Sequence, residues 1–174
     1  MQWDIELTKY ISSFSGGSNL LDSIGLFCSS YLIVFIGVFA VLWVLYKSSQ
    51  KNKIKHLIVF LLSSGVVFCV NFLIKIAIGR SRPFEQVADT PLAELLFHTP
   101  AFPSGHTAVA FALATLVFLH DKKAGVVVGI FAFFVAWSRI FVGVHFVSDI
   151  LAGIAVGIVV SFCVHKLITN NWKV

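Results

Sequence analysis

Two histidines and one aspartate are placed in this sequence where they could carry out nucleophilic attack and proton transfer. His145 and Asp149 lie within residues 138–149, between two uncharged apolar runs, in a chain of which only 12% is charged. Ionisable groups at membrane depth are costly unless they are paired or face a watery cavity, so they mark a candidate functional site. In a helix these two residues would share one face, where imidazole and carboxylate touch. A structural ion pair at the boundary of a span is the alternative interpretation of this pair alone.

Three basic residues, Lys75, Arg82 and Arg139, suit a substrate group with more than one negative charge, and phosphate is the obvious candidate. Residues 103–106, Pro-Ser-Gly-His, have the composition of a helix start. There Ser104 is a good N-cap, Gly105 allows close approach of the backbone, and free N–H groups attract an anion. An ordinary capped helix is the alternative for these four residues alone. Together with the three cations they predict a phosphate-binding site.

The two histidines permit a division of labour on a phosphate ester. His145, held by Asp149 in one tautomer, could attack phosphorus and form a phosphohistidine. His106 could protonate the leaving oxygen and then activate water. The same three residues are also ligand types for zinc or manganese. Because the three basic residues already supply positive charge and would repel a metal ion, the sequence favours a site without a metal or another cofactor.

The composition indicates an integral membrane protein. The mean hydropathy is +0.93, and 58% of the 174 residues are hydrophobic, which is far from a soluble composition. The length suits one domain, residues 1–174. The net charge of +5 comes without the basic and aromatic stripes of a soluble nucleic-acid-binding surface, so no nucleic-acid partner is expected.

Five apolar runs are predicted to be transmembrane helices: residues 23–46, 57–74, 107–119, 124–138 and 150–164. The first two approach or exceed the roughly 20 residues that a span requires, whereas the last three are shorter. Polar residues must complete these three spans, and they are the candidate site residues. Because consecutive spans run antiparallel, the end of the second, the start of the third, the end of the fourth and the start of the fifth open on one side. The candidate residues are therefore expected to converge there.

The basic residues that flank the spans predict the orientation. The lysines on the face opposite the candidate site predict that this face is cytoplasmic, by the positive-inside rule. The site then faces the periplasm or the cell exterior, in the inner (plasma) membrane. The lysines of the cytoplasmic face are Lys47, Lys51, Lys53, Lys55, Lys122, Lys123, Lys166 and Lys173.

Two further segments are too polar to span. Residues 1–14 combine aromatic and charged residues and predict a short helix lying in the interface. Residues 79–102 form the longest polar connection, and a loop of this length in a compact domain is usually functional or a lid. Within it, Arg80 and Glu85 are interpreted as solvated loop charges in preference to groups that shape the site.

The pattern of these residues resembles the three-part signature of the type-2 phosphatidic acid phosphatase superfamily, the membrane lipid phosphate phosphatases. The first part consists of Lys75 and Arg82-Pro83, separated by six residues. The second part is residues 103–106, and the third runs from Ser138 to Asp149. The resemblance implies an all-α membrane bundle of about six helices and metal-independent hydrolysis. It also implies His145 as nucleophile, Asp149 as its orienting partner and His106 as acid and base. Phosphate binding is implied for Lys75, Arg82, Ser104, Gly105 and Arg139.

Within this superfamily, the small size and residues 20–24, Leu-Leu-Asp-Ser-Ile, are similar to bacterial undecaprenyl pyrophosphate phosphatases. That similarity implies hydrolysis of undecaprenyl pyrophosphate to undecaprenyl phosphate, in recycling of the cell-wall lipid carrier. Many members of that subgroup lack the lysine of the first part, which is present here. Phosphatidylglycerophosphate, phosphatidic acid and lipid A phosphates therefore stay open as substrates. A transporter or binding protein that holds a phosphorylated lipid without cleaving it is the alternative from another class.

Overall fold

A computed structural model describes residues 2–86 and 99–171, and every regular element among them is a helix. The all-α class predicted from the sequence is therefore confirmed. The middle of the long polar connection, residues 87–98, lies outside the described residues, as does the side chain of Glu85. The helices are α1 (Gln2–Ser12), α2 (Asn19–Ser30), α3 (Leu32–Lys47), α4 (Lys53–Ile78), α5 (Pro83–Gln86), α6 (Gly105–His120), α7 (Lys122–Phe141) and α8 (Val147–Asn171).

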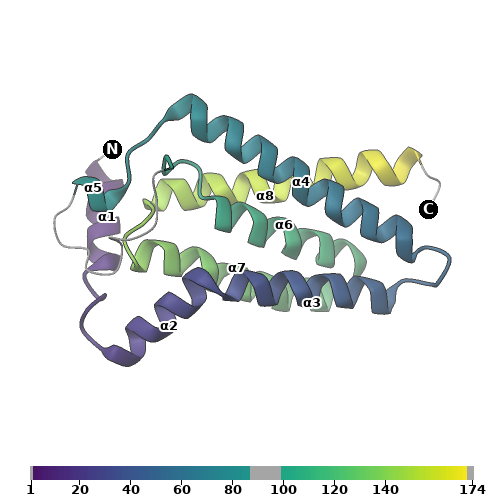
Figure 1. Ribbon diagram of the computed structural model, residues 1–174, viewed down its shortest axis with the longest axis horizontal. Helices are drawn as coiled ribbons and strands as arrows, with labels where there is room; N and C mark the ends of the chain where they lie inside the picture. Colours follow the sequence, from purple (N-terminus) through teal and green to yellow (C-terminus); the bar gives the residue numbers. More distant parts are fainter. Residues whose placement is uncertain (1, 87–98, 172–174) are drawn as a thin grey trace.

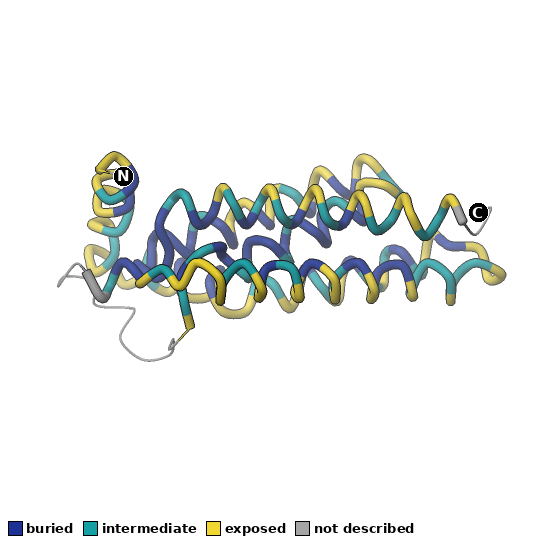
Figure 2. Tube along the Cα trace, turned by 90° about the horizontal axis from the view of Figure 1, so that it is seen from above, coloured by how far each residue is buried: buried dark blue, intermediate teal, exposed yellow. Residues whose placement is uncertain are grey.

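The long helices run side by side in an elongated bundle, and α6 packs against α3, α4, α7 and α8 (Figure 1). The small side chains of α6, among them Ala108, Ala110 and Ala112, are fully buried and let its neighbours approach closely. Exposed residues follow the outer faces of the bundle, and many of them are large and apolar, such as Phe35, Leu42 and Phe133 (Figure 2). Because an outer surface of this kind is stable against lipid rather than water, the helices form a membrane bundle.

Among the described residues, three helices, α4, α7 and α8, are long and apolar enough to cross a membrane, and the pair α2 and α3 makes a fourth span if it is counted as one. Helix α6 is apolar but has only 16 residues, about 24 Å at 1.5 Å per residue. The predicted spans thus fall on the observed helices, while the third one is short, as its sequence indicates.

The first predicted span, residues 23–46, is broken where one continuous helix was expected. Helix α2 ends at Ser30, α3 begins at Leu32, and their axes differ by 49°. At the break, Arg139 Nη1 donates to the carbonyl oxygen of Ser29 at 3.0 Å and to its hydroxyl oxygen at 2.6 Å. A side chain that inserts into the backbone hydrogen-bond ladder of a helix and bonds to one of its carbonyl groups is a recognised cause of a kink. The predicted single helix is therefore corrected to two helices, which together can still form one span.

Helix α8 lies against α6 through two glycines one helical turn apart. A Cβ atom added to Gly153 would lie 2.7 Å from the carbonyl oxygen of Ser104, and one added to Gly157 would lie 2.3 Å from that of Ala108. Both distances are shorter than van der Waals contact. The absence of side chains at these positions therefore allows the start of α8 to lie beside the start of α6.

Candidate active site

The predicted site residues lie at the end of the bundle where α4 and α7 finish and α6 and α8 begin (Figure 1). Two contacts tie these ends together. The backbone N–H of Ser104 donates to the carbonyl oxygen of Asp149 at 3.0 Å, which joins the start of α6 to the start of α8. Arg82 Nη1 donates to the carbonyl oxygen of Val144 at 3.0 Å, which joins the segment after α4 to the segment after α7.

His145 and Asp149 are almost completely buried, at 2% and 0% exposure. His145 Nδ1 lies 3.4 Å from Asp149 Oδ2, close enough for electrostatic pairing but longer than a good hydrogen bond. Hydrogen bonds of this kind in catalytic sites often tighten when substrate binds. The other ring nitrogen, Nε2, is the one that this arrangement leaves to act on a substrate. The N–H of Phe146 also donates to Asp149 Oδ2, at 2.8 Å, and holds the carboxylate in place.

The turn between α7 and α8 places His145. Gly143 has a φ of 75°, in the left-handed region that favours glycine, and the chain turns back there. The N–H groups of Val144 and His145 both donate to the carbonyl oxygen of Arg139, at 3.2 Å. The histidine is therefore fixed by its own backbone over the last turn of α7.

His145 is neutral at neutral pH. Burial lowers its pKa well below the usual value of 6.5, and the positive charges of Arg139, Arg82 and Lys75 lower it further. The His106 ring acts on it in the same direction. A neutral imidazole keeps the lone pair that a nucleophile needs.

The three predicted cations come from different elements. Lys75 lies in the last turn of α4, which Gly79 ends in a left-handed conformation. Lys75 Nζ donates to the carbonyl oxygen of Pro100 and, at 3.3 Å, to that of Ala101. Arg82 Nε donates to the carbonyl oxygen of Thr99 at 2.9 Å. These contacts hold the residues before α6 against the end of α4.

The start of α6 differs in one detail from the expected capped helix. Ser104 is fully buried and occupies the N-cap position, but its hydroxyl accepts a hydrogen bond from Thr107 Oγ1 at 3.0 Å and does not cap the helix amides. Ser104 therefore lies at the predicted N-cap position, but its side chain does not make the expected capping hydrogen bond. The first amides of α6 are thus left to bind an anion, as helix starts do.

A pocket of about 360 Å³ opens beside this helix start, between α3, α4 and α6. Lys75, Thr99, Gly105 and His106 line its polar end, and His106 and Lys75 are only partly buried. The rest of its lining is mainly apolar, from Ile33, Phe68, Phe72 and Val109. This pocket therefore presents a cation, an imidazole and a hydrocarbon-like wall to one ligand.

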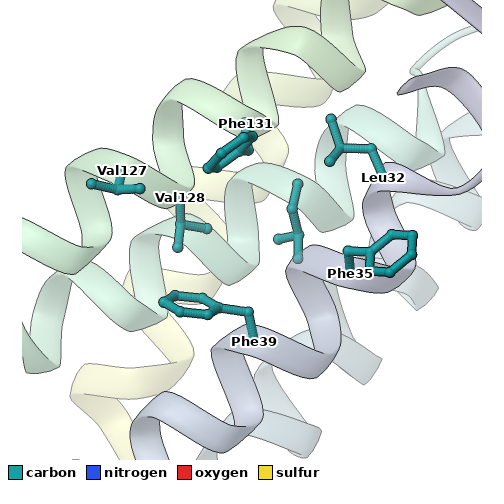
Figure 3. Close-up of a pocket in the computed structure, with 7 residues that line it drawn as sticks. Leu32, Phe35, Phe39, Val127, Val128 and Phe131 are labelled. Carbon is teal, nitrogen blue, oxygen red and sulfur yellow. The ribbon is translucent and has the colours of Figure 1, made fainter. Parts of the chain in front are cut away.

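A second hollow, of about 240 Å³, lies between α3 and α7 and is lined only by aliphatic and phenylalanine side chains, including Phe35, Phe39 and Phe131 (Figure 3). Its lining contains no group that could transfer a proton or bind an anion. Of these two pockets, the one beside α6 is therefore the candidate for ligand binding, and the buried His145 and Asp149 are not among its lining residues.

Arg80 belongs to the site, contrary to its interpretation as a solvated loop charge. Its Nη1 atom lies 2.7 Å from Asp149 Oδ1, and the side chain is only 25% exposed. The partner is 69 residues away in the sequence, so no local pattern reveals it. The sequence signal for Arg80 was its position within the segment from Lys75 to Arg82.

The PAP2 superfamily model matches residues 54–173, which include all the candidate residues. Undecaprenyl-diphosphatase BcrC of Bacillus subtilis (strain 168) is 31% identical over 159 residues, covering 90% of this chain and 80% of that protein. Phosphatidylglycerophosphatase B of the same organism is 33% identical over 119 residues, covering 62% and 55%. The crystal structure of a transmembrane PAP2 type phosphatidylglycerolphosphate phosphatase from Bacillus subtilis is similar in fold, with a TM-score of 0.67 and 23% identity over 99% of this chain and 86% of that chain.

Proposed function

This chain belongs to the PAP2 superfamily, and from that membership and the site geometry we propose that it hydrolyses undecaprenyl pyrophosphate to undecaprenyl phosphate and phosphate. The observation that carries the proposal is the buried pair His145 and Asp149, in the field of Arg139, Arg82 and Lys75. A neutral imidazole beside a carboxylate and three cations suits nucleophilic attack on a phosphoryl group.

In the first step, His145 Nε2 attacks the terminal phosphorus, and the bond from phosphorus to the bridging oxygen breaks. His106, which takes up a proton when the anionic pyrophosphate binds beside it, gives that proton to the bridging oxygen, so undecaprenyl phosphate leaves and a phosphohistidine remains. In the second step, His106 takes a proton from water as its oxygen attacks phosphorus, and the bond to nitrogen breaks. Phosphate leaves and His145 returns to its neutral form. Lys75, Arg82, Arg139 and the amides near Ser104 and Gly105 stabilise the charge on the phosphoryl oxygens.

Asp149 orients the nucleophile and does not itself take a proton. Its carboxylate fixes the Nδ1–H tautomer and favours the positive charge that develops on the ring. Because three cations supply the charge that a metal would otherwise provide, the reaction needs no metal ion.

The pocket beside α6 supports a lipid substrate. Its polar end would take the pyrophosphate next to Lys75 and His106, and its apolar wall would take the beginning of a hydrocarbon tail. Undecaprenyl pyrophosphate is preferred over phosphatidylglycerophosphate because the similarity to the undecaprenyl-diphosphatase extends over more of both chains. Lysines gather at the end of the bundle opposite the site, and by the positive-inside rule that end is cytoplasmic. The site is then at the outer face of the plasma membrane.

A substrate panel tests this function. Purified protein in detergent should release phosphate from undecaprenyl pyrophosphate with a higher kcat/KM than from phosphatidylglycerophosphate or phosphatidic acid, and a chelator should leave the rate unchanged. Binding of the lipid without turnover would favour a transporter or binding protein. Loss of the rate with chelator would favour a metal site, and a faster reaction with phosphatidylglycerophosphate would reassign the substrate.

Replacing Gly143 by alanine should slow this reaction by displacing His145. Alanine in a left-handed conformation costs about 1–2 kcal/mol, so the turn will shift or the protein will lose stability. Gly16→Ala is the matched control, because Gly16 also has a positive φ, 84°, but lies in the turn between α1 and α2. Both variants should melt at a lower temperature, and only Gly143→Ala should show a lower kcat. Equal kcat values in the two variants would contradict the role of this turn in positioning His145.

A further inference from the structure

Helix α1 turns two polar side chains inward, although an amphipathic helix on a lipid surface would turn them toward water. Asp4 and Thr8 lie one turn apart and are 1% and 2% exposed. Trp3, Leu7 and Tyr10, on the rest of the helix, are exposed. Helix α1 lies across the end of the bundle that holds the candidate site, and it contacts α7 and α8 (Figures 1 and 2). Its buried polar face therefore needs partners there.

The partners are the first amides of α8, which have no acceptor within their own helix. The N–H of Ser148 donates to Asp4 Oδ1 at 2.9 Å, and the N–H of Val147 donates to Thr8 Oγ1 at 3.2 Å. The hydroxyl of Ser148 also donates to Asp4 Oδ2. Helix α8 is thus capped by side chains more than a hundred residues earlier in the chain. Because Asp149 is the third residue of α8, this cap fixes the backbone that carries the catalytic carboxylate.

Arg80 joins the cap to the carboxylate. Its Nη2 atom lies 2.7 Å from Asp4 Oδ2, and its Nη1 atom lies 2.7 Å from Asp149 Oδ1 and 2.6 Å from Ser148 Oγ. The guanidinium also lies over the Phe146 ring, with Cζ 4.0 Å from the ring centroid. The planar fork of arginine can hold two carboxylates at fixed positions at once, which a lysine cannot do.

The charge of Asp4 supports this arrangement. Burial raises the pKa of Asp4, but the hydrogen bonds from Arg80 and Ser148 lower it more, and it lies below the usual value of 3.8. Asp4 therefore stays ionised at neutral pH. Its negative charge faces the guanidinium of Arg80, which also pairs with Asp149.

We propose that Asp4 and Arg80 are positioning residues, and that α1 is part of the active site because it holds Asp149, and through it His145, in place. The inference rests on the proposed function for its kinetic test. Neither residue lines the pocket that would take the substrate. Their loss should therefore disturb the orientation of the nucleophile and leave lipid binding intact.

Steady-state kinetics of Asp4→Ala and Arg80→Ala test the proposal. Each variant should lower kcat about 10- to 100-fold, as expected for loss of a charge-assisted hydrogen bond, with KM within about twofold of the wild-type value. Arg80→Lys should restore only part of the rate, since an ammonium cannot hold both carboxylates. Glu6→Ala is the matched control: Glu6 lies on the same helix, carries the same charge and is exposed, so its kcat should be unchanged. A wild-type kcat in Asp4→Ala or Arg80→Ala, or a rise in KM alone, would overturn the proposal.

The Asp149→Asn background separates positioning from a general structural role. If Arg80 acts through the Asp149 carboxylate, adding Arg80→Ala to the Asp149→Asn variant should lower kcat by less than about threefold. If the double variant instead loses kcat by the product of the two single-variant factors, Arg80 acts independently of Asp149, and the proposal is overturned.

Hydrogen exchange gives a readout that does not depend on activity. The amides of Val147 and Ser148 should exchange slowly in the wild-type protein and faster in Asp4→Ala, with no change in Glu6→Ala. Unchanged exchange in Asp4→Ala would overturn the capping of α8 by α1. A wild-type protein that releases no phosphate from any of the lipids, but shows this exchange pattern, would refute the proposed function and retain the α1 contact.

Discussion

His145→Ala should abolish phosphate release from undecaprenyl pyrophosphate while the protein stays folded. The imidazole is proposed to form the bond to phosphorus, and it lies 3.4 Å from the carboxylate that is proposed to orient it. Removing the nucleophile of a covalent mechanism costs about 10⁴-fold or more. The rate should therefore fall below detection in an assay that follows wild-type turnover easily. Size-exclusion chromatography and thermal denaturation in detergent would verify that the variant is folded.

Trapping the intermediate makes this prediction specific. Wild-type protein quenched in alkali during turnover should carry a phosphoryl group that is stable to base and labile to acid, as a phosphorus–nitrogen bond is, and His145→Ala should carry none. His56→Ala is the matched control, because His56 lies near the start of α4, at the opposite end of that helix from Lys75, and bonds to Ser48. It should keep both the rate and the phosphoprotein. Turnover by His145→Ala, or labelling of another residue, would refute the assigned nucleophile.

The sequence predicted the parts of the site whose residues lie on span ends. Because antiparallel helices of known order place alternate ends together, Lys75, Ser104, Arg139 and Asp149 could be assigned to one end before any contact was known. The structure brings them there. The proximity of His145 to Asp149 was predicted from a helical spacing of four residues, but His145 lies in the turn before α8 and outside that helix. The turn, rather than one helix face, brings His145 Nδ1 to 3.4 Å from Asp149 Oδ2.

The parts that the sequence did not reveal depend on contacts between distant residues. Arg80 pairs with Asp4, 76 residues away, and nothing near either residue indicates the pairing. At the break between α2 and α3, Ser29 bonds to Arg139, which is 110 residues away. Helix propensity and hydropathy describe each span separately, so they report its length and leave its partners and bends undetermined.

Gly157→Ala should destabilise the bundle and lower activity, although it replaces the poorest helix former after proline with the best one. The added Cβ would lie 2.3 Å from the carbonyl oxygen of Ala108, which belongs to the backbone of α6 and cannot rotate away. Helix α8 must then move away from α6. Overpacking of this kind costs about 1–3 kcal/mol, and it also strains the hydrogen bond from Ser104 N–H to the Asp149 carbonyl.

Gly65→Ala distinguishes this packing effect from a general effect of alanine, since a Cβ at Gly65 in α4 meets nothing within 4 Å. There the change should raise stability by up to about 1 kcal/mol, because alanine favours the helix. Thermal denaturation in detergent should thus shift in opposite directions for the two variants, and only Gly157→Ala should lose phosphate release. Equal shifts would mean that α6 and α8 need no close contact to assemble the site. In that event the start of α8 would be positioned by α1 and Arg80 alone. Asp4→Ala should then lower the rate of phosphate release more than Gly157→Ala does.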